Sequence, residues 1–596
     1  MESMLHNKVD KQIYYLLGGS ILLFAITVFL YHYYPVPNIL MDEYGYWSVG
    51  AYFAGKDWSA LNAITSYYAY GYGLLLSLFI RIAPSPEFCY QMALCFNGML
   101  VVGSFLVGYA TTCRLFKRAD RRYMAAVHMI ISLYPSFLFN AQIAWSETLL
   151  VFLFWVVVYL ILRIVERPQI HFSLAVVFVA VYMYTVHQRS LGILLSVLFL
   201  LTYLALRKRL PFWQFLTVGI FFVLLYILQS EIKEIVQNEV WPATDASRLA
   251  VNDFSGQTGK LQALFTAEGF GNLLYNVLGR LLYFGISSAL ILYVSLGRLT
   301  TSMVRHIKAL FVREQEAEFE RNILSIFLLM SFLSTLMIAS IYMLYPERVD
   351  QLFYGRYIEG TIAPILAVEL CSLISGEYRH KKKYLAVYLF GMVVVAVALF
   401  LRLNTGQLSD FFISCSNAMA RFFFDDNTNL YFFLFSAIAV SVLVGGVVLV
   451  GINDNKKRSM AGAGLILILY WFLLGNYSVE KEMDMYVGRK AAAINIADTM
   501  KEEGVEEIYY YNDSIEGSEQ LVAMIQFLLP DKTIRFLSKE EIPEGIGSKA
   551  RVLVATGSVY LNDFMEEQYK IVYGNQYLQI LKYGNTENSF QSGGNT

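Results

Sequence analysis

Residues 38–58 read NILMDEYGYWSVGAYFAGKDW and directly follow the first long apolar segment of the chain. The stretch opens with two adjacent carboxylates, Asp42 and Glu43. Aromatic residues come after them: Tyr44, Tyr46, Trp47, Tyr52 and Phe53. Apolar and aromatic positions recur every three to four residues, which predicts an amphipathic helix lying on a membrane surface. Two acids beside a group of aromatic rings at that surface indicate a functional site.

The composition of the whole chain indicates a polytopic membrane protein. Of its 596 residues, 57% are hydrophobic and 16% are aromatic, and the mean hydropathy is +0.49. A bilayer core requires spans of about 20 apolar residues, and only a chain with many such spans has this composition. The net charge of −1 indicates nothing about partners, and we expect no nucleic-acid partner. The five cysteines form no CxxC or His-containing metal pattern, so we expect no disulfide framework.

Two early apolar segments determine the topology. Residues 13–34 form a first span, and the YHYYPVPN that ends it is an aromatic interface belt rather than a cleavage site. We therefore expect an uncleaved anchor with a cytoplasmic N-terminus. Residues 69–83 are short for a span, and counting them as one would place the basic run CRLFKRADRR outside. We expect them to form a helix at the outer surface, within one large outer loop, 35–87.

The rest of the hydrophobic region, up to residue 478, follows from this choice. The predicted spans lie near 13–34, 88–112, 123–142, 148–165, 171–187, 190–206, 211–230, 271–297, 322–345, 357–376, 384–402, 429–451 and 460–478. With these thirteen spans every inner loop is basic, whereas the outer loops are mixed or acidic. The C-terminus is then outside.

From residue 479 the composition is that of a soluble protein. The runs VEEIYYYND, KTIRFLS and ARVLVATGS read as strands, with two more at 569–573 and 577–582 and helical patterns at 488–503 and 518–529. We expect a small extracytoplasmic α/β domain over 479–590 and a disordered tail, 587–596. It contains neither a GxGxxG after a strand nor a P-loop, so no nucleotide is assigned to it.

Three acids are the candidate catalytic residues. Asp42 and Glu43 could be two solvated acids at the end of a span, but the aromatic helix and the outer placement favour a site. Glu147, in IAWSETLLVFLFW, lies where an outer loop meets the next span, and an ionisable residue so close to hydrocarbon indicates function by default. The alternative is a helix N-terminus capped by Ser146, with Glu147 favoured by the positive end of the helix.

Isolated cations lie on the same side of the membrane. His187 and Arg189 occupy a turn between two spans, Arg356 lies at the entry of a later one, and Lys56 follows the aromatic stretch. An interfacial arginine can simply snorkel or pair with an acid, but its planar fork of donors also suits a phosphate. A carboxylate can accept the proton of an attacking hydroxyl or amine while cations stabilise a phosphate leaving group. Nucleotide sugars are absent outside the cell, so an activated sugar there would be carried by a lipid phosphate.

The run DEYGYWSVGAYFAGKDW resembles the first outer loop of membrane glycosyltransferases with the GT-C fold, in the aminoarabinose transferase and protein O-mannosyltransferase branch. The matching positions are Asp42, Glu43, Tyr46, Gly55 and Trp58. The resemblance covers about the first 190 residues and, beyond them, only the span count and an outer C-terminal domain. It implies that Asp42 is the base or orients the acceptor, that Glu147 is the second acid, and that a polyprenyl-phosphate sugar is the donor and is transferred with inversion.

The chain departs from that pattern at two places. Tyr44 and Gly45 stand where the aminoarabinose branch has an arginine, and Tyr68, Ala69 and Tyr70 stand where it has a Lys-Pro pair. Two phosphate contacts are therefore missing, and Arg189 or Arg356 would have to replace them, with His187 and Lys56 as further candidates.

The sequence thus predicts an all-α polytopic membrane protein with outer juxtamembrane helices and a small C-terminal α/β domain, in the plasma (inner) membrane of a bacterium. We expect an enzyme that transfers a sugar from a polyprenyl phosphate to a lipid, polysaccharide or protein acceptor. Tyr46, Tyr70 and Tyr357 are expected to line the substrate. No spacing demands a cofactor, although Asp42, Glu43 and Glu147 could hold a divalent cation. The rival functions are a flippase for lipid-linked sugars and a non-catalytic membrane assembly protein.

Overall fold

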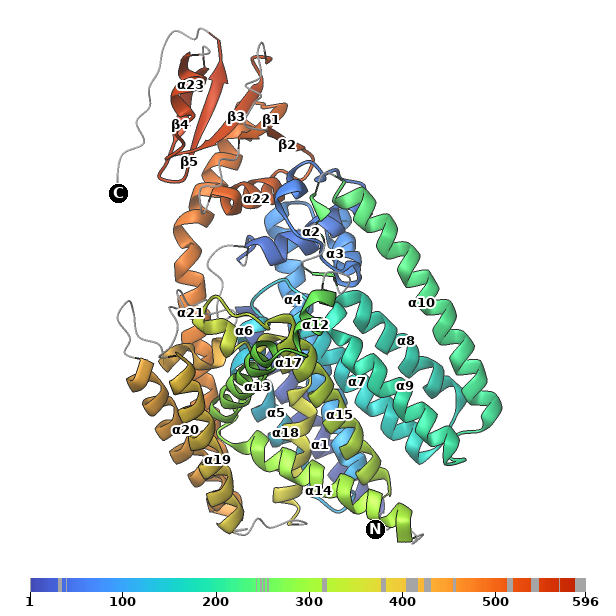
Figure 1. The fold of residues 1–596 in the computed structure, drawn as a ribbon. Coiled ribbons are helices and arrows are strands. Elements are labelled where there is room, and N and C mark those ends of the chain that lie inside the picture. The colour runs from blue at the N-terminus through green and yellow to red at the C-terminus, as the bar shows by residue number, and fades with distance from the viewer. Residues whose placement is uncertain are drawn as a thin grey trace. The chain divides into compact units, whose positions relative to one another are not determined.

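The structure is a computed structural model that describes residues 2–29, 35–38, 40–242, 244–246, 249, 252–253, 257–312, 319–376, 382–403, 416–422, 430–453, 457–511, 518–537, 546–566 and 569–584 (Figure 1). The chain divides into two compact units. We call Met1–Tyr31, Leu94–Ser230 and Gln257–Glu482 the membrane unit, and His32–Ala93, Glu231–Gly256 and Met483–Thr596 the mixed unit. The helices α4, α10 and α21 contribute residues to both.

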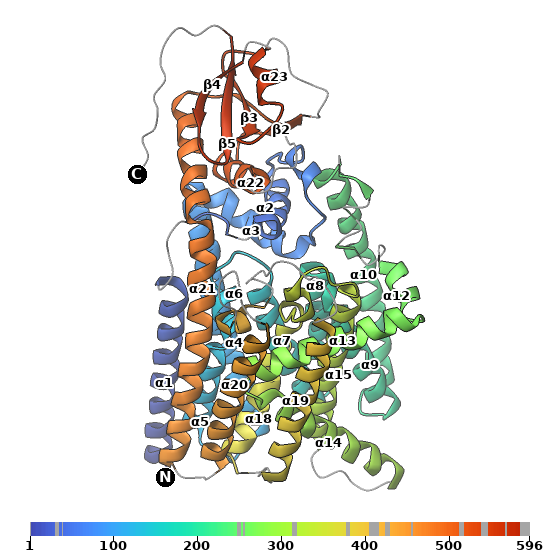
Figure 2. The ribbon, with the colours of Figure 1, turned by 60° about the vertical axis from the view of Figure 1, so that its left-hand side comes forward.

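The membrane unit is helical over most of its described residues. It is built from α1 (Glu2–Phe29), α4 (Pro86–Leu115), α5 (Arg121–Ser132), α6 (Pro135–Asn140), α7 (Glu147–Glu166), α8 (Ile170–Val186), η2 (Gln188–Ser190), α9 (Leu191–Leu206), α10 (Phe212–Val240), α12 (Thr258–Ala263), α13 (Ala267–Ser287), α14 (Ile291–Val312), α15 (Phe319–Tyr342), α16 (Val349–Leu352), α17 (Arg356–Glu359), α18 (Ile362–Ile374), α19 (Lys382–Leu403), η5 (Asn417–Phe422), α20 (Leu430–Asn453) and α21 (Lys457–Glu502). The helices α19 and α20 lie side by side (Figures 1 and 2).

Within the described residues, eight helices are long and apolar enough to cross a membrane, or up to ten if each of two bent pairs is one span. The protein is therefore a multi-pass membrane protein, as predicted. The three other predicted spans are shorter or interrupted. Residues 123–142 are divided between α5 and α6 ahead of Pro135, whose ring disfavours helix in the residue before it. Residues 171–187 form α8, a 17-residue helix, and the apolar part of α19 is Leu389–Leu399.

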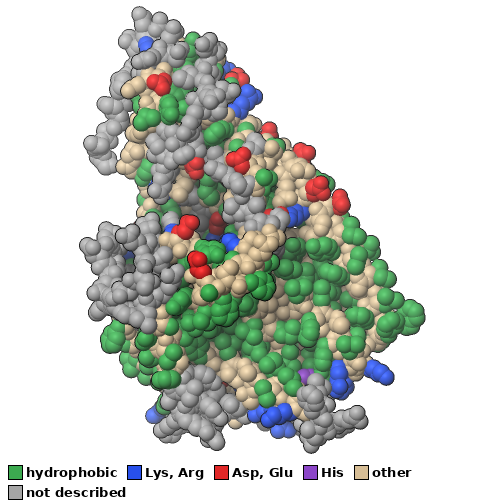
Figure 3. Space-filling view, in the orientation of Figure 1, with side chains coloured by type: hydrophobic (Ala, Val, Ile, Leu, Met, Phe, Trp, Pro, Cys, Tyr) green, Lys and Arg blue, Asp and Glu red, His purple; other side chains and the backbone are tan. Residues whose placement is uncertain are grey.

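The flank of the membrane unit over α8, α9 and α10 is apolar (Figure 3). Large side chains are exposed there, among them Phe178, Phe199, Trp213 and Ile220. Lys and Arg side chains gather along the end of the unit near α14 and the turn between α9 and α10 (Figure 3). An apolar belt bounded by a basic edge is typical of helices that cross a bilayer.

The helices α13 and α14 form a pair that is bent by 114°. Residues 289–290 at the bend adopt positive φ angles of 48° and 64°, although neither is glycine. At the bend the carbonyl of Ile286 accepts a hydrogen bond of 3.1 Å from the backbone N–H of Ala289, and α21 supplies a further donor to it and a donor to the carbonyl of Ser287. The hydroxyl of Tyr470 donates to the carbonyl of Ile286, and the indole N–H of Trp471 donates to that of Ser287, both at 2.8 Å. Buried irregular backbone is tolerated in a membrane protein when other groups satisfy it in this way.

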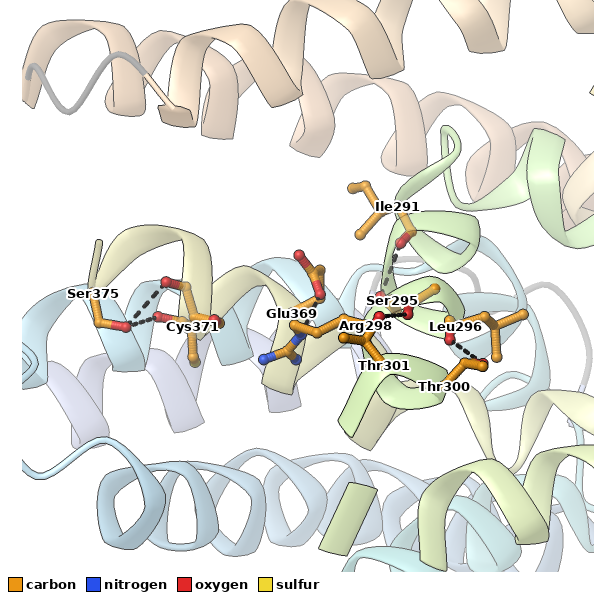
Figure 4. A network of polar contacts seen from close by, with 11 residues as sticks. Ile291, Ser295, Leu296, Arg298, Thr300, Thr301, Glu369, Cys371 and Ser375 are labelled. Atoms are coloured by element: carbon orange, nitrogen blue, oxygen red, sulfur yellow. Dashed lines mark hydrogen bonds and ion pairs between the residues drawn. The ribbon is translucent and has the colours of Figure 1, made fainter. Parts of the chain in front are cut away.

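A buried ion pair joins α14 to α18 (Figure 4). The guanidinium of Arg298 donates from Nε to a carboxylate oxygen of Glu369 at 2.7 Å, and their side chains are 10% and 0% exposed. The predicted span 271–297 ends one residue before Arg298, which places this arginine at the start of a predicted inner loop. Arg298 lies instead inside α14, as its eighth residue, and its charge is compensated by the acid of a neighbouring helix.

The mixed unit combines α2 (Leu40–Ala54), η1 (Leu61–Ile64) and α3 (Tyr70–Ile82) with a C-terminal sheet. The sheet and its helices are β1 (Glu507–Tyr511), α22 (Ser518–Leu528), β2 (Ile534–Leu537), β3 (Ala550–Ala555), α23 (Leu561–Glu566), β4 (Tyr569–Gly574) and β5 (Leu578–Tyr583). The strand order is β2-β1-β3-β5-β4, with β1 parallel to β2 and β3 and with β5 antiparallel to β3 and β4. All five predicted strands are thus present. The helical pattern predicted at 488–503 is the end of α21, one continuous helix (Figure 2).

The first helix of the mixed unit differs from its prediction. Every residue of α2 from Glu43 to Ala51 is buried, so α2 is not an amphipathic helix on a membrane surface. It packs against α3 on one side and α22 on another. The contact with α3 is close because a Cβ atom at Gly73 would lie 2.6 Å from Cβ of Val49. Its aromatic side chains contact different neighbours: Tyr46 packs against Tyr72 of α3, and Trp47 packs against Phe527 of α22.

Candidate functional site

The carboxylate of Asp42 lies in the first turn of α2, where the positive end of the helix favours an acid. Its side chain is partly exposed, and one carboxylate oxygen accepts a hydrogen bond of 2.6 Å from the hydroxyl of Tyr68. The ring of Tyr68 crosses α2 at Gly45, where a Cβ atom would lie 1.9 Å from the ring. The two departures from the family pattern, Gly45 and Tyr68, are therefore in contact with each other. Together they hold the candidate base.

The neighbouring acid, Glu43, is fully buried. One oxygen accepts a hydrogen bond of 2.7 Å from the hydroxyl of Tyr90, and the other accepts from the backbone N–H of Asn38. The side-chain amide of Asn38 also donates to that tyrosine hydroxyl, at 3.2 Å. These bonds attach the start of α2 to the start of α4, so the geometry favours a supporting role for Glu43 beside a more accessible Asp42.

Aromatic side chains pack around α2. Tyr46 makes edge contacts with Tyr68 and with Tyr72, each at 5.4 Å between ring centroids. Tyr44 stacks on Trp58 at 5.8 Å, and burial raises the pKa of its hydroxyl well above the ordinary value. Tyr70 lies in a cluster with the end of α10. Tyr46 and Tyr70 are buried, so their contribution in the described structure is to packing.

The segment after α2 contacts the C-terminal domain. Lys56 forms an ion pair with Asp531, which follows α22. The indole N–H of Trp58 donates to the carbonyl of Pro530 at 3.0 Å, and Trp47 packs edge-on against Phe527 at 4.9 Å. The turn between α22 and β2 therefore fixes the helix that carries Asp42.

A second group of candidate residues meets in the membrane unit around Glu147. One oxygen of this carboxylate accepts from Nη2 of Arg189 at 3.0 Å and from Nε of Arg356 at 2.7 Å. The three side chains are 8% exposed or less, and they come from the starts of α7 and α17 and from η2. Ser146 makes no side-chain cap bond at the start of α7, whereas Glu147 does lie in the first turn, where the positive end of the helix favours an acid.

The rings of this cluster hold the arginines in place. Arg356 lies over the ring of Trp145, 3.8 Å from its centroid, and Arg189 lies over Tyr357 at 4.8 Å. The ring of His187 is 5.6 Å from that of Tyr357. The structure therefore brings together every predicted site residue that lies in this unit.

A small cavity of about 20 Å³ lies beside the cluster and is lined by both arginines, Glu147 and Glu359. Nη1 of Arg189 is buried and has no hydrogen-bond partner in the part of the chain that the structure describes. Glu359, which is not among the site residues predicted from the sequence, accepts a hydrogen bond from the hydroxyl of Tyr283. Its only signal in the sequence was its position three residues after Arg356.

The candidate cation ligands are divided between the units. Asp42 and Glu43 belong to the mixed unit, whereas Glu147 in the membrane unit is occupied by two arginines. No group of three or more His, Cys, Asp and Glu side chains is arranged to hold a metal ion within the described ranges.

The hydrogen bond from Tyr68 to Asp42 gives a testable prediction. Tyr68→Phe removes one bond to a charged acceptor, a type that contributes about 1.5–3 kcal/mol. We expect kcat to fall about 10- to 100-fold while KM changes little, because the bond orients the base rather than the ligand. The matched control is Tyr52→Phe in α2, the helix that carries Asp42. A Tyr68→Phe protein with unchanged kcat would remove this tyrosine from the site.

Gly45 gives a second prediction through the same contact. Gly45→Ala would place a methyl group 1.9 Å from the ring of Tyr68, so the ring must move and its bond to Asp42 must lengthen. We expect the same loss of kcat as in Tyr68→Phe, and no further loss when the two substitutions are combined. Gly219→Ala, where nothing lies within 4 Å, is the control. Additive losses in the double variant would show that the two residues act independently.

Comparisons with known proteins place the chain by its fold. No protein-family profile matches the chain, and no curated protein matches its sequence. The structure is similar to ArnT from Cupriavidus metallidurans in the apo state, with a TM-score of 0.51, 13% identity and coverage of 97% of this chain and 100% of that one. Its form bound to undecaprenyl phosphate gives a TM-score of 0.47, 14% identity and coverage of 96% and 99%. The oligosaccharyltransferase of Archaeoglobus fulgidus gives a TM-score of 0.44 and 11% identity, with coverage of 88% of this chain and 64% of that one. The chain therefore has the GT-C fold of ArnT, as the sequence predicted.

Proposed function

We propose that this GT-C-fold protein is an inverting glycosyltransferase that moves a sugar from a polyprenyl phosphate to an acceptor at the extracytoplasmic surface of a bacterial plasma membrane. The observation that carries the proposal is Asp42, a partly exposed carboxylate fixed at the start of a buried helix by Tyr68. The fold shared with ArnT, a protein that binds undecaprenyl phosphate, supports the choice of donor.

In the proposed reaction Asp42 accepts the proton of the acceptor hydroxyl or amine as that group attacks the anomeric carbon. The bond from this carbon to the donor phosphate breaks on the opposite face, and its electron pair leaves with the phosphate, which inverts the configuration. The hydroxyl of Tyr68 holds one carboxylate oxygen in place, so that the base is oriented before the acceptor arrives.

The cluster around Glu147 is proposed to bind the donor phosphate. Two guanidinium groups share one carboxylate, which leaves Nη1 of Arg189 directed to no other described group. A phosphate oxygen could take that donor, and the positive charge of Arg356 would add to the attraction. His187 and Tyr357 border the same arginines. Glu147 then acts as a positioning residue for the arginines. Lys56 belongs to the mixed unit and pairs with Asp531, so we do not assign it to the donor phosphate.

Transport of a lipid-linked sugar is the second candidate, because the membrane unit contains two apolar helix pairs with a sharp bend. The pair of Asp350–Glu359 and Ile362–Ile374 is bent by 74°, and Arg356 lies beside the break. Interrupted helices that carry charges are typical of transporter binding sites. A flippase would move labelled lipid between leaflets without an acceptor, whereas a transferase would consume the donor.

The deciding experiment measures transfer of radiolabelled sugar from a panel of undecaprenyl-phosphate sugars to membrane extracts, with and without a chelator. Label moved by the wild type and not by Asp42→Asn would identify the donor and support the enzyme. Equal transfer by both proteins would refute the proposed base. Leaflet exchange of labelled donor without any transfer would favour the flippase.

A further inference from the structure

A cavity with a volume of about 480 Å³ lies within the mixed unit. It lies where the segment after α2, the turn between α3 and α4, the end of α21 and the turn between α22 and β2 meet. Its walls are partly apolar, with Trp58, Pro84 and Phe527 among them. This volume falls in the range of cavities that hold small ligands, about 300–1,000 Å³.

Positive charge is concentrated in this cavity. Lys56, Arg81, Lys501 and Lys532 line it, each from a different segment of the chain, and Asp531 is the acid among the lining residues. Cations that are far apart in sequence and face one space produce a positive potential, which low-dielectric walls focus. The cavity therefore suits an anionic ligand.

Two of these cations are compensated and two are not. Lys56 pairs with Asp531, and Lys501 lies 3.3 Å from a carboxylate oxygen of Asp498. The guanidinium of Arg81 donates to the backbone carbonyl of Phe53, which leaves its charge without a counter-ion. Across the residues that the structure describes, no acid forms an ion pair with Arg81 or with Lys532. These two side chains carry the charge that no direct ion pair neutralises, and Lys532 interacts electrostatically at longer range with Glu506, which pairs with Lys549.

We propose that this cavity binds a phosphate-bearing group, either the headgroup of a lipid or a sugar phosphate. A phosphate monoester carries up to two negative charges and matches the two uncompensated cations, while Arg81 offers the planar fork that suits phosphate oxygens. The remaining volume accommodates the group that bears the phosphate.

The cavity is connected to the candidate base by direct contacts inside the mixed unit. Trp58, in its wall, stacks on Tyr44, which lies two residues after Asp42 in the first turns of α2. We assign the bound group to the acceptor rather than to the donor on this basis. That assignment rests on the proposed function, whereas binding of phosphate by the cavity does not.

The test measures binding to the full-length protein in nanodiscs made of a neutral lipid. The probes are glucose 1-phosphate and a short-chain phosphatidic acid, each compared with its unphosphorylated counterpart, glucose or diacylglycerol. We expect the wild type to bind at least one phosphorylated probe, and Arg81→Gln/Lys532→Gln to bind it about tenfold more weakly or worse. Arg81→Lys/Lys532→Arg should retain most of the affinity because the charge is kept.

The matched control is Arg535→Gln/Lys570→Gln, which removes two exposed cations from β2 and β4. Its affinity should equal that of the wild type. Equal losses in the two glutamine variants would overturn the proposal, because binding would then follow net charge alone. Absence of binding to both phosphorylated probes would overturn it as well. Preference for one phosphorylated probe would support the proposal and identify the source of the phosphate.

The transfer assay separates this site from the proposed function. If the wild type binds a phosphorylated probe but transfers no sugar, the site stands and the enzyme proposal fails. If transfer to a phosphorylated acceptor is unchanged in Arg81→Gln/Lys532→Gln, the assignment to the acceptor is wrong. A rise in KM for that acceptor, with kcat retained, would support the assignment.

Discussion

Asp42→Asn is expected to lower sugar transfer by about 10²–10⁴-fold, the contribution typical of a general base. Asparagine keeps the size of the side chain and can still accept a hydrogen bond from Tyr68, so the fold of α2 should be retained. The donor should bind with unchanged affinity because the proposed phosphate contacts lie in the other unit. Transfer is measured with the labelled donor identified above, and folding is followed by thermal unfolding.

The matched control for this substitution is Asp57→Asn. Asp57 is an exposed acid just beyond the other end of α2, and its carboxylate accepts from the hydroxyl of Ser59 at 2.6 Å. Its loss should leave transfer within twofold of the wild type. A stable Asp42→Asn protein with full activity would refute the mechanism, and an equal loss in both variants would point to the charge of the loop rather than to one base.

Glu147→Gln is the second substitution for which we expect a large effect. It leaves two guanidinium groups buried without their carboxylate, and breaking a buried ion pair from one side costs about 3–5 kcal/mol. We expect a clear fall in the unfolding temperature and a loss of donor binding, because Arg189 and Arg356 would repel each other. Thermal unfolding in detergent and titration with polyprenyl phosphate measure the two effects.

The same helix provides a control for Glu147→Gln. Glu166, at the other end of α7, also has two arginine partners, Arg114 at 3.0 Å and Arg163 at 3.7 Å, but these are 38% and 21% exposed. Exposed pairs contribute about 0–1 kcal/mol, so Glu166→Gln should change stability little. If the two variants were equally stable and bound donor equally well, the cluster around Glu147 would have no special role.

Local patterns made much of the fold predictable. Each of the five strands is either an alternation of apolar and polar residues or a continuous apolar run, bounded by residues typical of turns. Its predicted position therefore agrees with the structure to within a few residues. The start of α2 was recognisable from Asp42 and Glu43 in its first turn. The predicted surface position of α2 was wrong because α3 and α22 cover it. The pattern of residues within α2 does not show which other helices will pack on it, and α22 is far away in the sequence. Aromatic residues that could face lipid face those helices instead.

The pairing inside the candidate sites was not predictable in the same way. Arg189 and Arg356 were selected because each was an isolated cation near a span end. Their common partner, Glu147, is separated from them by 42 and 209 residues, and nothing local indicates that the three converge. Tyr68 was recorded only as a departure from a pattern, and its bond to Asp42 depends on the absence of a side chain at Gly45. Spacing along the chain carries no information about such contacts.

The bend between α13 and α14 has a consequence for the order of synthesis and membrane insertion. The residues that satisfy its carbonyls, Tyr470 and Trp471, are made 184 positions after the carbonyls they bond. Until α21 is inserted, the carbonyl of Ser287 lacks its donor from Trp471, at a cost of several kcal/mol if it is left in hydrocarbon, whereas that of Ile286 keeps its bond from the backbone N–H of Ala289. The nascent chain must therefore keep this bend hydrated or bound to other proteins while more than a hundred residues are added. A ribosome-stalled chain that ends before residue 457 should be a substrate for membrane quality control, although most of its spans have already been made.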